Sequence, residues 1–107
     1  MTSTFEVVAE PTRRRILDLL LAGGCSVGEL VSGLAVSQPA VSRHLRVLRE
    51  AGLVSSRTDA QRRLYSVNAA PLAEIATWLE PYRRMWAGRL ELLSAHLDSM
   101  PDESGEA

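Results

Sequence analysis

The stretch from Ser37 to Gly52 constrains the fold of this 107-residue chain more than any other part of the sequence. Ser37 is a preferred helix N-cap, Pro39 falls in the first helical turn, and Gly52 stands where such a helix ends. In between, apolar residues recur at the i, i+4, i+7 spacing of one helix face, at Val41, Leu45 and Leu48. The pattern predicts a helix over residues 38–51 with one buried face and one free face.

Three shorter helices are predicted before this one, over residues 3–9, 11–22 and 27–33. The second of them carries two pairs at i, i+4 spacing that are expected to be buried, Ile16/Leu20 and Leu17/Leu21. Ser26 and Glu29 have the spacing of a capping box at the start of the third. Only a short break separates the third helix from the helix at 38–51, which indicates a helix-turn-helix.

Two short strands and a long helix are predicted after it. Residues 53–58 and 62–67 have the pattern of a β-hairpin with a basic tip. The helical pattern beyond Asn68 begins with a stripe that fits an intramolecular core, at Leu72, Ile75 and Leu79. Pro81 is expected to break or kink this helix. The fold class is therefore mostly α with a small β-hairpin, a winged helix-turn-helix.

Charge is distributed unevenly along the chain, although the formal net charge is only −1. Residues 37–67 carry six arginines against two acidic residues, and the free face of the 38–51 helix adds Gln38 and Ser42. Arginine pairs with guanine edges, glutamine pairs with adenine edges, and serine hydroxyls suit phosphates. These residue types favour a surface that binds double-stranded DNA.

Three segments carry a family resemblance, namely Pro11–Leu17, Ser37–Val54 and Arg62–Val67. They resemble the ArsR-type winged-helix repressors of bacteria, which implies a homodimer that binds a palindromic operator and represses transcription. The helix face and the resemblance together give the candidate DNA-binding residues: Ser37, Gln38, Pro39, Ser42, Arg43, His44, Arg46, Arg49, Arg57, Arg62 and Arg63. Ala35 in the turn and the wing tip depart from the family pattern, which has glycine at both places. An alanine at positive φ would be strained.

The metal positions of the family's founding members do not match this sequence. Their thiolate ligands correspond here to Ser26 and Gly28, and Cys25 lies one residue out of register. The last helix offers three ligand types without the spacing of the family's second metal site, at Glu91, His96 and Asp98. We therefore expect no metal and no cofactor. Residues 78–86 and 96–98 resemble the metal-free autorepressor branch of the family.

Cys25 is the only cysteine in the sequence, so an internal disulfide is excluded and a reducing compartment is expected. It stands just before a predicted helix N-terminus, a place that lowers the pKa of a thiol. A redox-responsive repressor that senses through Cys25 is therefore an alternative function. The plainer interpretation is a small residue at a helix start.

The last helix carries more large apolar residues than one small core absorbs. Together with apolar residues of the first helix they predict a homodimer interface, at Phe5, Val7, Val8, Tyr82, Met85, Trp86, Leu90, Leu93 and Leu97. A twofold dimer would place two recognition helices about 34 Å apart, one turn of DNA.

The sequence also gives expectations for the domain organisation and the location of the protein. Residues 1–99 are expected to form one domain and residues 100–107 a disordered acidic tail. The sequence has no apolar run of the about 20 residues that span a membrane, and we expect a cytoplasmic protein.

The sequence has no catalytic motif, which argues against an enzyme. A winged helix that binds protein instead of DNA is the alternative class, because fold alone does not decide function. The sequence leaves open whether a small-molecule effector exists.

Overall fold

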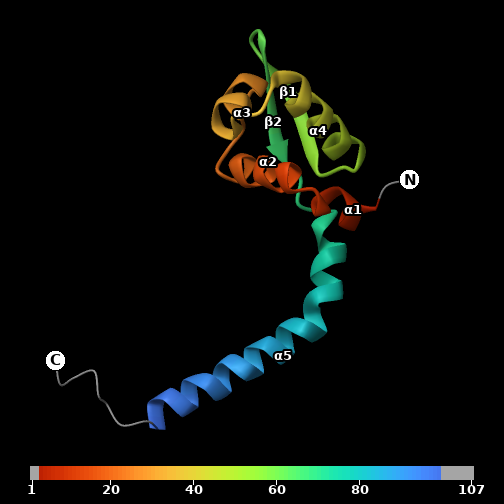
Figure 1. Cartoon of the computed structure of the whole chain (residues 1–107). Coiled ribbons are helices and arrows are strands. Elements are labelled where there is room, and N and C mark those ends of the chain that lie inside the picture. The colour runs from red at the N-terminus through yellow and green to blue at the C-terminus, as the bar shows by residue number, and fades with distance from the viewer. Residues whose placement is uncertain (1–2, 100–107) are drawn as a thin grey trace, which may run out of the picture. The chain divides into compact units, whose positions relative to one another are not determined.

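The computed structural model describes residues 3–99 and is mostly helical, with one two-stranded antiparallel sheet (Figure 1). The elements are α1 (Thr4–Ala9), α2 (Pro11–Leu21), α3 (Val27–Leu34), α4 (Gln38–Glu50), β1 (Val54–Asp59), β2 (Arg62–Val67) and α5 (Leu72–Ser99). The chain forms two compact units that divide between Ile75 and Ala76, inside α5. The first unit is a winged helix-turn-helix, as the sequence predicts. The predicted acidic tail at 100–107 lies outside the described residues.

Side-chain caps set the starts of the helices in the first unit. The hydroxyl of Ser26 accepts a hydrogen bond from the Glu29 amide at 3.2 Å, and the Glu29 carboxylate accepts one from the Ser26 amide at 3.0 Å. Ser37 caps α4 in the same manner by accepting from the Ala40 amide at 3.3 Å. Both predicted caps are therefore confirmed, and each satisfies an amide that the helix itself leaves unpaired.

A single apolar core holds the first unit together. Its fully buried large side chains come from four helices and the start of the hairpin: Val7, Ile16, Leu30, Val41, Leu45, Leu48 and Leu53. Two expectations are wrong here. Val7 is in this core and not on a partner surface, because α1 packs against α2. Leu21 is 78% exposed, because it lies about 100° around α2 from the buried Leu20.

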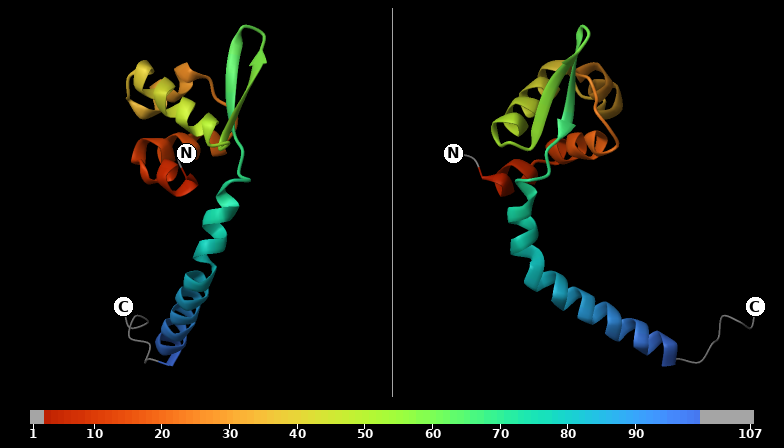
Figure 2. Two further views of the ribbon diagram at one scale, coloured as in Figure 1. Left: turned by 90° about the vertical axis from the view of Figure 1, so that its right-hand side faces the viewer. Right: turned by 180° about the vertical axis from the view of Figure 1, so that it is seen from behind.

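The hairpin stands beside the helices and its tip projects beyond them (Figure 2). Its register pairs Val54 with Val67 at the base and Asp59 with Arg62 at the tip. Tyr65 anchors it to the loop between α2 and α3, since its amide donates to the Cys25 carbonyl at 2.8 Å and its carbonyl accepts from the Cys25 amide at 3.0 Å. This pair of hydrogen bonds fixes the wing to the helical part of the first unit.

Helix α5 runs through Pro81 without interruption, so of the two predicted outcomes, a break or a kink, the break is not observed. Proline removes one backbone hydrogen bond, here to the carbonyl of Thr77, which a helix of 28 residues can lose and still continue. None of the described side chains of α5 is buried. Leu72 and Ile75 are half-buried, and Leu72 packs against the core of the first unit as expected. The third residue of the predicted stripe, Leu79, is 37% exposed, so its expected burial is wrong. Among residues 3–99, no helix is both long and apolar enough to cross a membrane.

Candidate nucleic-acid interface

Helix α4 separates its residues into a buried face and an exposed face. Val41, Leu45 and Leu48 are at most 2% exposed, which fixes the rotation of the helix about its own axis. The predicted DNA-contacting residues of α4 and its cap are exposed with one exception; the exposed ones are Ser37, Gln38, Pro39, Ser42, Arg43, Arg46 and Arg49. The burial of one face therefore presents guanidinium, amide and hydroxyl groups on the other.

Arg46, on the exposed face of α4, is weakly engaged within the protein. Arg46 Nε lies 3.9 Å from Glu50 Oε1, and the two side chains are 83% and 69% exposed. An ion pair this exposed is screened by water and contributes little to stability. Arg46 can therefore exchange Glu50 for a phosphate or a base edge at small cost.

The wing contributes three exposed arginines, Arg57, Arg62 and Arg63. The strand register places Arg63 opposite Thr58 and Arg62 opposite Asp59. Arg62 also interacts with Glu29 of α3. Hydrogen bonds from Ser26 lower the pKa of the Glu29 carboxyl, and the charge of Arg62 lowers it further. Arg62 thus has two acidic neighbours, Asp59 across the hairpin and Glu29 on α3.

His44 is the exception among the predicted residues, because its ring faces the protein. Its Nδ1 lies 3.8 Å from Glu10 Oε2, and its side chain is 22% exposed. The same Glu10 oxygen accepts a hydrogen bond from the Arg13 amide at 2.9 Å and so caps α2. A contact between His44 and the DNA backbone stays a prediction, and the contact with Glu10 was not predicted.

The run of three arginines at 13–15 has a structural role that was not predicted from the sequence. Arg13 Nε donates to the Val7 carbonyl at 2.7 Å, and Arg14 donates to the Val8 and Ala9 carbonyls at 2.8 and 3.0 Å. Arg15 reaches the Leu34 carbonyl at the end of α3, at 3.3 Å. These guanidinium groups pair the terminal carbonyls of two helices that have no basic residue in their own last turns. The absence of a basic residue from the last turns of α1 and α3 could have indicated, from the sequence alone, that arginines elsewhere in the chain pair these carbonyls.

The structure corrects the expectation for the Cys25 thiol. Burial raises its pKa, and the Glu29 carboxylate raises it further, so the predicted lowering is wrong. Burial, together with the negative charge that Glu29 of the capping box brings to the same turn, outweighs the helix N-terminus. A raised pKa leaves less thiolate and makes Cys25 less reactive. Its backbone meanwhile pairs with Tyr65, which is a structural role.

The expectation that the protein binds no metal rests on Ser26 and Gly28, which stand where the family's founding members have thiolate ligands. Within residues 3–99, no group of three or more histidine, cysteine, aspartate and glutamate side chains is arranged to hold an ion.

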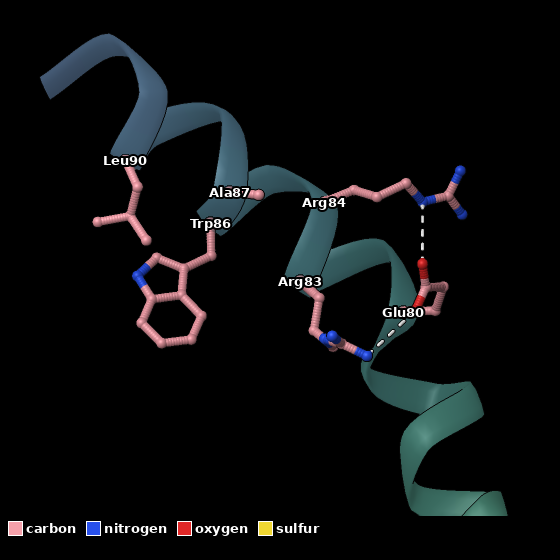
Figure 3. A pocket seen from close by; sticks show the side chains of 6 residues that line it. All are labelled: Glu80, Arg83, Arg84, Trp86, Ala87 and Leu90. Atoms are coloured by element: carbon pink, nitrogen blue, oxygen red, sulfur yellow. Dashed lines mark ion pairs between the residues drawn. The ribbon is translucent and has the colours of Figure 1, made fainter. Parts of the chain in front are cut away.

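The predicted interface residues of α5 are exposed along the helix: Tyr82, Met85, Trp86, Leu90, Leu93 and Leu97. Figure 3 shows Trp86 and Leu90 projecting from the same side of the helix, in a shallow hollow lined with Glu80, Arg83, Arg84 and Ala87. Glu80 forms ion pairs with Arg83 at 3.7 Å and Arg84 at 3.8 Å. Charged pairs thus lie next to a continuous apolar face. In the first unit, Phe5 and Val8 are half-buried.

Comparison with known proteins agrees with this geometry. Residues 10–56 match the profile of the family described as bacterial regulatory protein, arsR family. The transcriptional repressor SdpR of Bacillus subtilis is 34% identical over 79 residues, which span 74% of this chain and 88% of SdpR. The chain belongs to the ArsR family of bacterial regulatory proteins.

Two further relatives of this ArsR-family chain match nearly its whole length. The HTH-type transcriptional regulator Rv2034 of Mycobacterium tuberculosis is 39% identical over 100 residues, 94% of this chain and 91% of Rv2034. A crystal structure titled as a possible transcriptional regulator for arsenical resistance superimposes with a TM-score of 0.69 at 38% identity, over 94% of this chain and 100% of that one. The chain is therefore a DNA-binding transcriptional regulator and not an enzyme.

Proposed function

We propose that this ArsR-family regulator is a repressor that binds a palindromic operator as a homodimer, without a metal cofactor, in the cytoplasm. The observation that carries the proposal is the division of α4, whose buried face leaves its arginines, Gln38 and Ser42 exposed beside a basic wing. Related proteins named repressors, such as SdpR, support the direction of regulation.

The homodimer is supported by the apolar face of α5. Trp86, Leu90 and Leu93 are 66%, 49% and 53% exposed. Monomeric proteins seldom expose a contiguous row of large apolar side chains on this scale, and a second copy of the chain would cover it. Twofold symmetry would then present two α4 helices to two half-sites.

The absence of a metal cofactor is supported by the residues at the family's thiolate positions. Serine and glycine stand at positions 26 and 28, and the side chain of Ser26 is already used to cap α3. Cys25, the nearest thiol, has a raised pKa and is a poor soft-metal ligand by itself.

Selection from a random-sequence duplex library tests the proposal. The full chain is expected to enrich an inverted repeat whose half-sites are centred about one helical turn apart, roughly 10 base pairs. The Arg46→Ala variant is the comparison, and it should enrich a more degenerate sequence because one base contact is lost. Recovery of no common sequence by the wild-type chain would contradict the proposal, and recovery of a single unpaired site would contradict the homodimer.

A further inference from the structure

His44 and Glu10 join the recognition helix to the start of α2. Their side chains are 22% and 33% exposed, so water screens this pair less than it screens Arg46 and Glu50. Glu10 Oε2 holds the Arg13 amide and faces His44 Nδ1 at the same time. A single carboxylate therefore connects the first turn of α2 with the middle of α4.

The place of His44 in α4 gives this connection a consequence for DNA recognition. Val41 and Leu45 hold α4 against the core from one side. His44 holds it at a second point, next to Arg43 in the chain and two residues before Arg46. Base readout depends on small displacements of such side chains, since hydrogen bonds weaken steeply when distance or angle departs from the optimum.

The charges around the pair set the direction of a pH effect. Glu10, the N-cap of α2, lies beside the His44 ring, Arg13 in the first turn of α2 acts on Glu10, and Arg43 is next to His44 in the sequence. Partial burial raises the pKa of the Glu10 carboxyl, but the Arg13 amide and the charges of His44 and Arg13 outweigh it and lower the pKa overall. The Glu10 carboxyl thus stays ionised throughout the range of about pH 5 to pH 8, in which histidine is the side chain that serves proteins as a pH-dependent charge. Protonated His44 attracts Glu10, and neutral His44 does not.

We propose that His44 is a positioning residue for operator recognition, and that its protonation strengthens the contact with Glu10 and so raises sequence discrimination as pH falls. This inference rests on the proposed function, because it concerns the same surface of α4. It differs from a simple charge effect, since one added positive charge would strengthen binding to every DNA sequence alike.

Fluorescence anisotropy at about pH 6 and about pH 8 separates the two effects. The measured quantity is the ratio of the dissociation constants for a scrambled duplex and for the selected operator duplex. In the wild-type chain this ratio should rise about fivefold from the higher to the lower pH, the scale of a partly screened ion pair. In Glu10→Gln it should stay constant, because glutamine keeps an acceptor for the Arg13 amide without the charge.

Two further variants complete the test. His44→Gln removes the charge from the other partner and should also give a constant ratio. His96→Gln is the matched control, because His96 is exposed on α5, and it should keep the wild-type pH dependence. The positioning role would be overturned if lower pH raised the affinity for both duplexes equally. It would also be overturned if the ratio of dissociation constants in Glu10→Gln still rose as the pH fell. A wild-type ratio that is above one but the same at both pH values would overturn the positioning role and leave the proposed function intact. A ratio of one at both pH values would contradict the proposed function itself.

Discussion

Residues 3–75 and the part of α5 beyond Ala76 use large apolar side chains in opposite ways. In the first region the large aliphatic residues of α3, α4 and β1 are largely buried, and the exposed residues of α4 and the wing are mainly polar. In the second region every described large apolar side chain is exposed. The first region buries most of its own large apolar residues, while those of the second stay on its surface. The contrast supports the proposal that the first region reads DNA and that the second joins two copies of the chain.

The largest expected effect concerns the core of the first region. Leu48→Ala removes a fully buried side chain and should lower the free energy of unfolding by about 2–5 kcal/mol. Leu21→Ala is the matched control, because Leu21 is exposed at the end of α2, and it should change stability by less than about 0.5 kcal/mol. Urea denaturation followed by circular dichroism measures both. Equal losses in the two variants would show that the burial described for this region is wrong.

A charge placed on α5 tests the second region. Leu93→Glu should dissociate the dimer and weaken operator binding by at least about 100-fold, since two linked sites bind far more tightly than one. Ala95→Glu adds the same charge on the side of the helix opposite Trp86, and should leave both properties close to wild type. Sedimentation velocity and anisotropy give the two readouts. A monomeric Leu93→Glu that binds the operator tightly would remove the role assigned to α5.

Two arginines of the first region should respond differently to truncation. Arg46→Ala should reduce discrimination between operator and scrambled DNA by about 1–3 kcal/mol, because a base contact is lost. Arg62→Ala should weaken binding to both duplexes alike and reduce the salt slope by about one, because a phosphate contact is lost. Salt-dependent titrations distinguish these outcomes. The opposite assignment would mean that the wing reads bases and that α4 serves mainly to position the protein.

The smallest effect concerns the turn between α3 and α4. Ala35 has φ +56°, a conformation that costs an alanine about 1–2 kcal/mol. Ala35→Gly should therefore raise the free energy of unfolding by up to about 1 kcal/mol after the entropy of glycine is subtracted. Ala9→Gly, in a regular helical conformation, should change it in the opposite direction. Thermal unfolding checks the sign, and destabilisation by Ala35→Gly would show that the turn carries no such strain.

The sequence predicted local structure well because local chemistry determines it. The caps at Ser26 and Ser37, the buried stripe of α4 and the hairpin all follow from neighbours in the chain. The strain expected for an alanine in the turn is also present, since Ala35 adopts positive φ.

The errors concern contacts between segments that lie far apart in the sequence or effects that compete at one position. The guanidinium of Arg15 pairs with Leu34, and His44 faces Glu10, because the helices meet only in the fold. Burial is the main cause of the raised pKa of the Cys25 thiol, followed by the charge of Glu29, and burial depends on the fold and not on the spacing of residues. Which of the exposed residues touch bases and which touch phosphates stays a prediction.

The central claim, that α4 reads DNA while α5 joins two copies, is tested most directly by the two half-sites. The measurement is an anisotropy titration of the wild-type chain against a selected inverted repeat and against the same duplex with one half-site scrambled. The account predicts that scrambling one half-site weakens binding by at least about 100-fold in the wild type. It also predicts almost no difference between the two duplexes for Leu93→Glu. Equal wild-type affinity for both duplexes would contradict the claim.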